Sequence, residues 1–236
     1  MFSGVKAHVV ERISAAPVLA SPFPHCVVDE VFPEEFYEEI LDHWPAADRF
    51  VSGVETGRVT KGYSEERKIL NFDKTHLSRL EASQRVFWAE AVLPLVRSPG
   101  VSRAILAKFR REIAERLADG REVFSTDALI VSDRTAYALG PHSDSPQKLV
   151  SLLFYLPEDA TFKRYGTSLY VPRDPTFSCA EGWHYDEKHF TRISTVEFIP
   201  NRLLLFPRTD RSFHGVERVD VPGIERRLLI SSIRAM

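Results

Sequence analysis

A histidine and an aspartate, His142 and Asp144, stand two positions apart near the start of the stretch PHSDSPQKLVSLLFYLPED (residues 141–159). In an extended chain, residues i and i+2 point to the same side, so the imidazole and the carboxylate share one space. His214 offers a third ligand from another β-like segment, SFHGVERV. Two histidines and one carboxylate leave half of an octahedral coordination sphere open, a pattern typical of non-haem Fe(II) sites. We therefore predict a metal site at His142, Asp144 and His214.

A pair of arginines, Arg226 and Arg227, opens the last apolar segment of the chain, ERRLLISSIR. An arginine at the start of that strand can extend beside the metal, and its rigid planar fork suits a carboxylate. The combination favours a ligand that chelates the metal at one end and carries a carboxylate at the other, which is the shape of 2-oxoglutarate. Neighbouring residues of a strand point to opposite faces, so only one arginine can line such a pocket. The pattern leaves open which one does.

Each of these residues also has a simpler interpretation. His142 and Asp144 are compatible with a surface turn whose aspartate caps the backbone. His214 is compatible with a hydrogen-bonded core histidine, and Arg227 with a surface arginine paired to Glu225. The order of the three ligands and the late arginine along the chain favours the metal site over these interpretations.

A rival metal motif is the stretch WHYDEKH, which contains His184, Asp186 and His189. It lies in the segment 172–194, which shows no clear periodicity, and long irregular loops in compact domains are usually functional or disordered. No later arginine completes a pocket beside it. We interpret this segment as a lid or a substrate-contact loop.

Helical spacing dominates the chain before Gly120. Apolar side chains recur at a period near 3.6 in the segments 33–44, 83–96 and 102–120, which predicts three amphipathic helices. Pro94 is expected to bend the end of the second helix, and Gly120 is expected to cap the third. The polar segment 50–78 is expected to be a loop with one short strand.

After Gly120 the chain becomes a succession of short β-like segments separated by Pro, Gly, Asp and Asn. Many short strands with turns between them indicate a sandwich or a barrel-like double sheet. The expected strands cover residues 122–133, 149–157, 167–172, 195–200, 202–208, 212–221 and 226–234. The segment LVSLLFYL is apolar on both faces, as expected of a central strand.

In these segments the chain resembles the 2-oxoglutarate- and Fe(II)-dependent dioxygenases, in particular the prolyl-4-hydroxylase-like branch. The resemblance runs from about Tyr137 to the C-terminus through YALGPHSD, LVSLLFYLP, GTSLYV, NRLLLFPR, FHGVERV and RRLLISSI. It extends more weakly to PFPHCVVDEVFPEEFYEEILDHWP near the N-terminus. It implies a mainly β, α+β fold with a double-stranded β-helix core, also called a jelly roll and similar to cupins. N-terminal helices, in residues 1–120, are then expected to support a core formed by residues 121–236, as one domain.

The resemblance also implies roles for single residues. His142, Asp144 and His214 become the iron ligands, with 2-oxoglutarate and O₂ as cosubstrates and succinate and CO₂ as products. The family's carboxylate-binding arginine falls on Arg227, preferred to Arg226, so that Leu229 and Ser231 share its face. Tyr155 is expected to hydrogen-bond the same carboxylate, and Tyr137 to line the pocket. Related halogenases lack the metal-binding carboxylate, so Asp144 favours hydroxylation.

Composition narrows the choice of partners. The chain has 236 residues, 31 basic against 33 acidic, with a net charge of −2, which argues against a nucleic-acid partner held by bulk charge. No apolar stretch is long enough to span a membrane, and the N-terminus does not resemble a signal peptide. The two cysteines, Cys26 and Cys179, indicate no disulfide framework, so a reducing cytoplasm is the expected location.

The expected substrate is a small molecule or a side chain of a peptide or protein, because the substrate-binding loops of such enzymes vary. Two other functions remain open at this stage. One is a non-catalytic jelly-roll protein for binding or sensing. The other is a cupin-like metalloenzyme that works without 2-oxoglutarate, although such proteins usually carry an HxH motif in place of HxD.

Overall fold

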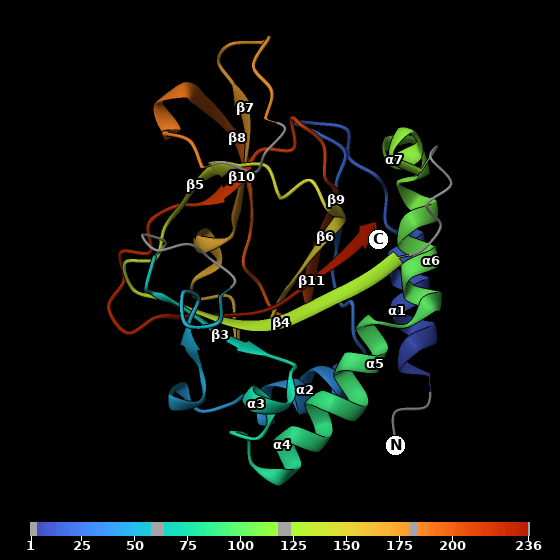
Figure 1. Ribbon diagram of the computed structural model, residues 1–236, viewed down its shortest axis with the longest axis vertical. Coiled ribbons are helices and arrows are strands. Elements are labelled where there is room, and N and C mark those ends of the chain that lie inside the picture. The colour runs from blue at the N-terminus through green and yellow to red at the C-terminus, as the bar shows by residue number, and fades with distance from the viewer. Residues whose placement is uncertain (1–3, 58–63, 118–123, 180–183, 236) are drawn as a thin grey trace.

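The computed structural model describes residues 4–57, 64–117, 124–179 and 184–235, and these form two antiparallel β-sheets with helices beside them (Figure 1). The larger sheet has seven strands in the order β1-β9-β6-β11-β4-β3-β2. They are β1 (Cys26–Val28), β2 (Val51–Ser52), β3 (Arg67–Asn71), β4 (Phe124–Arg134), β6 (Lys148–Tyr155), β9 (Arg202–Pro207) and β11 (Glu225–Ala235). The mainly β fold with helices, expected from the sequence, is confirmed.

The smaller sheet has four strands in the order β5-β10-β7-β8. They are β5 (Leu139–His142), β7 (Thr167–Pro172), β8 (Phe190–Val196) and β10 (His214–Val216). The helices of the described residues are α1 (Val5–Ala15), α2 (Glu34–Asp42), α3 (Lys74–Leu77), α4 (Ala82–Val86), α5 (Leu93–Val96), α6 (Pro99–Lys108) and α7 (Arg110–Leu117), and a π-helical segment (Phe87–Val92) joins α4 to α5. Short 3₁₀ turns occupy Ala47–Arg49, Lys163–Tyr165 and Glu187–His189.

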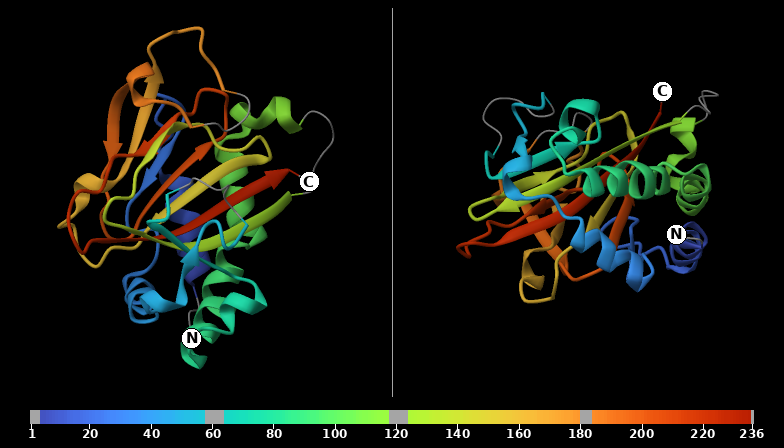
Figure 2. Two further views of the ribbon diagram at one scale, coloured as in Figure 1. Left: turned by 60° about the vertical axis from the view of Figure 1, so that its left-hand side comes forward. Right: turned by 90° about the horizontal axis from the view of Figure 1, so that it is seen from below.

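The larger sheet lies between the helices and the smaller sheet (Figures 1 and 2). Alternate residues of β11 show this arrangement, because Leu229 and Ile233 pack with helix residues such as Trp88 and Ile105, whereas Leu228 packs with Leu169 of β7. A central strand covered on both faces must be apolar on both faces, which explains the continuous apolar runs in β6 and β11. The face toward the smaller sheet is the one that can line a cavity.

The helical segment 83–96 differs from the regular helix expected. Pro94 stands in the first turn of α5 and follows the π-helical segment, instead of bending the end of a helix. A proline has no N–H to donate to the carbonyl four residues earlier, here that of Glu90, and π-helical turns accommodate such an interruption. The helix expected over 33–44 is present as α2.

The single helix predicted over 102–120 is wrong, because the chain leaves helical geometry at Phe109 and forms α6 and α7. The ring of Phe109 is fully buried among the helices and the larger sheet, and this burial outweighs helical continuity. Gly120, expected to cap this helix, lies outside the described residues.

Some of the described residues between the motifs form strands and a helix that were not predicted. Residues 50–78 contribute β2, β3 and α3, and β3 pairs with β4, so the N-terminal half supplies strands to the larger sheet as well as helices. The irregular segment 172–194 ends in the edge strand β8, which begins at Phe190, and the strand expected over 195–200 stops at Val196. The strand expected over 212–221 is limited to His214–Val216. None of the described helices is long and apolar enough to cross a membrane.

Candidate metal centre and adjoining cavity

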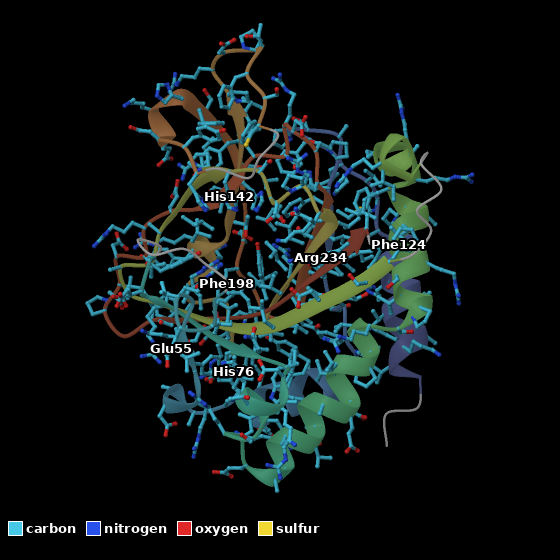
Figure 3. The ribbon with its side chains drawn as sticks, in the orientation of Figure 1. Glu55, His76, Phe124, His142, Phe198 and Arg234 are labelled. Atoms are coloured by element: carbon cyan, nitrogen blue, oxygen red, sulfur yellow. The ribbon has the colours of Figure 1, made fainter. Side chains whose placement is uncertain are left out.

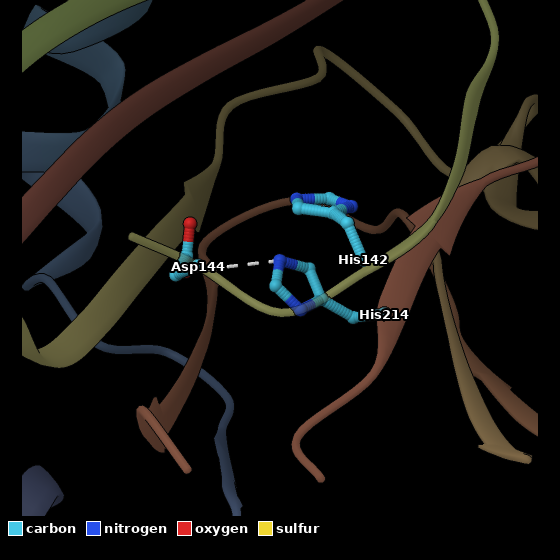
Figure 4. Close-up of side chains that lie close together, drawn as sticks. All are labelled: His142, Asp144 and His214. Atoms are coloured by element: carbon cyan, nitrogen blue, oxygen red, sulfur yellow. Dashed lines mark ion pairs between the residues drawn. The ribbon is translucent and has the colours of Figure 1, made fainter. Parts of the chain in front are cut away.

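The pairing of β5 with β10 brings His142 and His214 together. The two residues are direct partners in the antiparallel register, and their ring centroids lie 4.2 Å apart. Asp144 follows β5 and turns its carboxylate toward the rings, with Oδ2 at 3.8 Å from His214 Nε2 (Figure 4). The three ligand atoms all lie within 4.8 Å of one another. One ion therefore has room to contact all three residues.

Hydrogen bonds fix the tautomer of both histidines. His142 Nδ1 lies 3.1 Å from the carbonyl oxygen of Gly140, and His214 Nδ1 lies 3.0 Å from that of Ser212. A carbonyl only accepts, so each Nδ1 carries the proton and donates it. Each Nε2 is then left with a lone pair for a metal, and the backbone carbonyl orients the ring as an outer-shell partner does in metal sites.

Burial and charge set the protonation states that a metal requires. The imidazoles of His142 and His214 are each less than a tenth exposed, and this burial lowers the pKa of both rings below the ordinary value of 6.5. Burial alone would raise the pKa of Asp144, but the positive charge of Lys148, whose Nζ lies 2.7 Å away, and the two nearby imidazoles hold that pKa well below its usual range. Near neutral pH the site consequently offers two neutral imidazoles and one carboxylate.

The residues of the rival motif do not converge. His184 forms a β-bridge with His142, and its ring centroid lies 4.5 Å from that of His142, so it stands at the rim of the same site. Asp186 is exposed and accepts a hydrogen bond from the backbone N–H of Lys188, and His189 is exposed in the following 3₁₀ turn. Within the described part of the chain, the group of three close metal-binding side chains is His142, Asp144 and His214.

The segment that carries His184 is held against β5. The N–H of Tyr185 donates to the carbonyl oxygen of Pro141 at 2.9 Å, and a Cβ on Gly140 would lie 2.8 Å from the carbonyl oxygen of Tyr185. Only glycine permits this close crossing. Tyr185 of the same segment also packs in an aromatic cluster. The cluster consists of Tyr170, Phe177, Tyr185, Phe190 and Phe213.

A cavity of about 450 Å³ opens between the two sheets beside the triad. It is lined by His142, Asp144, His184 and His214 on one side and by alternate residues of β11 on the other. The inward residues of β11 are Arg226, Leu228, Ile230, Ser232 and Arg234, and Ser231 also borders the cavity. Figure 3 labels two of the lining residues, His142 and Arg234.

Arg226 lines the cavity, and its side chain is fully buried. Its Nη1 donates to Asp133 Oδ2 at 2.6 Å, and its Nε donates to the carbonyl oxygen of Tyr165 at 2.5 Å. The Phe198 ring lies against the guanidinium, with its centroid 5.1 Å from Cζ. The remaining nitrogen, Nη2, is buried without a hydrogen-bond partner. A buried charged donor without a partner is costly, which marks this position as one that awaits an acceptor.

Arg227, the arginine preferred from the sequence, lies on the opposite face and does not line the cavity. Its guanidinium pairs with Glu158 at 2.7 Å and Glu225 at 2.9 Å and lies over the ring of Trp44. Leu229 shares that face and packs toward the helices, and the hydroxyl of Ser231 bonds the backbone of β4. Arg226, and not the preferred Arg227, is therefore the arginine that faces the cavity, because strand alternation places Arg227 and Leu229 on the opposite face.

The two predicted tyrosines lie near the Arg226 end of the cavity. Tyr155 is fully buried and donates its hydroxyl proton to Thr167 Oγ1 at 2.7 Å, and burial raises the pKa of its hydroxyl. Thr167, and not Tyr155, is the side chain that lines the cavity, so Tyr155 contacts the cavity through Thr167. Tyr137 is also fully buried, and the Arg67 guanidinium lies over its ring at 4.5 Å from the centroid.

Sequence reasoning missed Arg67, Asp133 and Thr167 at this end, and Lys148 and Ser151 beside Asp144. The sequence does contain a pattern that could have identified Asp133. In the expected strand 122–133, a period of two places Asp127 and Asp133 on one face with Leu129 and Val131. An aspartate at the end of such an apolar face indicates a buried cationic partner. No comparable pattern marks Arg67, because the residues directly before it, Ser64, Glu65 and Glu66, show no apolar alternation.

No protein-family model matches the chain, and no curated protein matches it. Solved structures do match over nearly its whole length. A prolyl hydroxylase from Trichoplax adhaerens, in complex with a peptide fragment of the hypoxia inducible factor oxygen degradation domain, is 15% identical, with a TM-score of 0.51 over 98% of this chain and 89% of that one. A prolyl-4-hydroxylase from Pseudomonas putida is 15% identical, with a TM-score of 0.52 over 98% and 99%.

A third similar structure is the non-heme alpha ketoglutarate dependent epimerase SnoN from nogalamycin biosynthesis. It is 11% identical, with a TM-score of 0.54 over 98% of this chain and 83% of that one. At such low identity these matches report on the arrangement of the backbone. They show that the chain adopts the jelly-roll fold that prolyl hydroxylases share with an alpha ketoglutarate dependent epimerase.

Proposed function

We propose that this chain is an Fe(II)- and 2-oxoglutarate-dependent dioxygenase that hydroxylates a small molecule or a side chain of a peptide. The observation that carries the proposal is the convergence of His142, Asp144 and His214, whose ligand atoms lie within 4.8 Å of one another beside a cavity. The fold shared with prolyl hydroxylases and an alpha ketoglutarate dependent epimerase supports it.

The donor set suits Fe(II). Two neutral imidazoles whose Nε2 lone pairs are available, together with one carboxylate, form a set that non-haem iron accepts and that leaves positions for other ligands. Lys148 and Ser151 both donate hydrogen bonds to the carboxylate of Asp144 and so orient it toward the rings. Such outer-shell contacts are worth about 10–100-fold in metal affinity.

The other end of the cavity suits the far carboxylate of 2-oxoglutarate. Arg226 Nη2 is buried and lacks an acceptor, and a carboxylate in the cavity would supply one. Thr167 lines the same region and is held by Tyr155, so its hydroxyl is a second available contact. Apolar side chains, Val131, Leu153 and Leu228, also line the cavity and suit the methylene groups of the ligand.

In the reaction we propose, bound iron supplies the site at which O₂ is activated while 2-oxoglutarate is converted to succinate and CO₂. The residues of the chain act by position and charge. Arg226 holds the far carboxylate and thereby sets the distance of the keto acid from the triad. Asp144 remains ionised because Lys148 favours its charged form, and it keeps its place among the ligands.

We place the primary substrate at the end of the cavity that lies away from Arg226. That end is polar and contains Asp127, Ser232 and Arg234, with Arg234 about one-third exposed. His184 stands at the rim beside His142, where it can contact a bound molecule. One similar structure holds a peptide and another belongs to an epimerase of nogalamycin biosynthesis, so both a peptide side chain and a small molecule are reasonable substrates.

The test is succinate release by the purified chain supplied with Fe(II), 2-oxoglutarate and pooled metabolites or peptides. We expect succinate to form in an iron-dependent manner with at least one pool and to be absent for His142→Ala. Binding of 2-oxoglutarate without succinate from any pool would instead identify a non-catalytic binding protein. Turnover of a pool component without consumption of 2-oxoglutarate would identify a cupin-like metalloenzyme.

A further inference from the structure

Three side chains lie in a row across the inner face of the larger sheet at the Arg226 end of the cavity. Asp133 of β4 is the direct register partner of Arg67 on β3 and of Arg226 on β11. Asp133 and Arg226 are fully buried, and the side chain of Arg67 is 13% exposed. One carboxylate is therefore shared between two guanidinium groups that reach it from neighbouring strands.

The two arginines share this carboxylate unequally. Arg67 contacts both oxygens, with Nε at 2.6 Å from Oδ1 and Nη2 at 2.8 Å from Oδ2. Arg226 contacts only Oδ2, through Nη1 at 2.6 Å. The bidentate geometry, which is the stronger arrangement for an arginine and a carboxylate, belongs to Arg67. Arg226, which lines the cavity, consequently keeps Nη2 buried without an acceptor.

The charges of this row do not cancel. Counted by themselves, the two guanidinium groups and the one carboxylate of the row carry a net charge of +1, because arginine does not lose its proton in proteins. A single carboxylate from a ligand would neutralise the row. The same carboxylate would complete the hydrogen bonding of Arg226.

We propose that Arg67 is a positioning residue for cosubstrate binding. Because Arg67 occupies both oxygens of Asp133, Asp133 cannot form a bidentate pair with Arg226. Arg226 Nη2 therefore stays available to the far carboxylate of 2-oxoglutarate. This inference rests on the proposed function. Without Arg67, the carboxylate of Asp133 is free to turn and form a bidentate pair with Arg226. That pair would be neutral and would direct one N–H of Arg226 Nη2 to Asp133, so that the ligand would meet neither a net positive charge nor an unused Nη2.

The experiment measures binding to the full chain loaded with Mn(II), which removes turnover from the readout. Two ligands are compared by calorimetry, namely 2-oxoglutarate and 2-oxobutyrate, which retains the keto acid but lacks the far carboxylate. For Arg67→Met we expect the affinity for 2-oxoglutarate to fall about 10–100-fold, as expected for loss of a charge-assisted hydrogen bond. The affinity for 2-oxobutyrate and for Mn(II) should stay within about twofold of the unaltered chain.

A second substitution separates positioning from a general role in stability. In the double variant Arg67→Met with Asp133→Asn, the competing carboxylate is gone and Arg226 alone provides the positive charge, so the affinity for 2-oxoglutarate should recover. A merely structural role predicts instead that the double variant binds as weakly as Arg67→Met or more so. Arg67→Lys keeps the charge but contacts a single oxygen at a time, so it should show an intermediate loss and serves if the methionine variant does not fold.

Lys68 supplies the matched control, because it is the next residue of β3, carries the same charge and points to the opposite face. Lys68→Met should leave the affinity for both ligands unchanged. Unchanged affinity of Arg67→Met for 2-oxoglutarate, or no recovery in the double variant, overturns the inference while the proposed function stands. If the unaltered chain binds 2-oxoglutarate no better than 2-oxobutyrate, the proposed function itself fails.

Discussion

Arg226 and Arg227 are adjacent in the sequence, yet their guanidinium groups lie on opposite faces of β11 and in different environments. Arg226 is fully buried in the cavity beside the triad, and Arg227 pairs with Glu158 and Glu225 on the outer face. The difference follows from strand alternation alone. Arg226 is therefore placed to bind a ligand in the cavity, whereas Arg227 forms ion pairs on the outer face.

Substitution of each arginine by methionine should therefore affect a different property, ligand affinity for Arg226 and stability for Arg227. Arg226→Met should weaken binding of 2-oxoglutarate to the Mn(II)-loaded chain by at least about tenfold, since it removes a charge-assisted hydrogen bond. Arg227→Met should leave that affinity unchanged and lower stability by no more than about 1 kcal/mol, because its partner Glu158 is largely exposed. Calorimetry and denaturant unfolding of both variants check this. Equal loss of affinity in the two variants would contradict the assignment.

Removal of a triad carboxylate should abolish tight metal binding. Asp144→Ala takes away one of three ligands and leaves Lys148 without its partner, so Mn(II) affinity should fall by at least about 100-fold, beyond the loss caused by outer-shell changes. Asp186 offers a matched control, since it belongs to the other HxD motif but lies exposed on the 3₁₀ turn. Asp186→Ala should bind Mn(II) as the unaltered chain does, and a comparable loss there would argue against the triad.

Stability of the metal-free protein should fall as the pH drops below about 6.5. Burial lowers the pKa of His142 and His214 in the folded state, so between that lowered value and the ordinary pKa the unfolded chain binds more protons than the folded one. Stability then rises with pH across this window and is lost on acidification. Melting temperatures between about pH 7.5 and pH 5 measure the slope.

The matched variant for this pH test is His142→Gln with His214→Gln, which removes both titrating rings. The melting temperature of this double variant should fall clearly less than that of the unaltered chain between about pH 7.5 and pH 5. Asp144 acts in the same direction but at lower pH, because its lowered pKa becomes relevant only below about 4. An identical slope in the double variant would show that other groups control the acid sensitivity.

Gly215 should be intolerant of a side chain. A Cβ at this position would lie 2.5 Å from the carbonyl oxygen of Leu139 and 3.1 Å from that of Gly140, so it would force β10 away from β5. Because that pairing aligns His214 with His142, Gly215→Ala should cost about 1–3 kcal/mol of stability and also weaken Mn(II) binding. Gly100→Ala in α6, where the nearest atom is 3.6 Å away, should be neutral or slightly stabilising.

The sequence predicted structure best where apolar residues form strand-like segments or where ligand-type side chains occur at a specific spacing. His142 and Asp144 share a side because they are two residues apart, and the apolar segments after Gly120 indicated the strands of the jelly roll. The choice between Arg226 and Arg227 was not decidable in this way. Both faces of β11 are apolar beyond the arginines, since the strand is covered on both sides, and the pattern therefore carries no sign of which face is inward.

Other features depend on contacts between distant segments. The break at Phe109 has no proline or glycine to mark it and results from burial of its ring against the larger sheet. Arg67 meets Asp133 only because β3 pairs with β4, and the residues before β3 contain no strand pattern that predicts this pairing. The strand β8 is exposed along most of its length, and an edge strand of that kind lacks the apolar alternation that identifies strands in a sequence.

The proposed metal ligands come from β5 and β10 of the smaller sheet and from the residues just after β5, whereas Arg226 comes from the larger sheet. A molecule gripped at both places would tie the two halves of the sandwich together across their interface. Its binding energy would oppose their separation, so amide protons of β5, β10 and β11 should exchange with deuterium more slowly once it is bound. A ligand bound in the cavity would then hold the two sheets together and stabilise the folded chain.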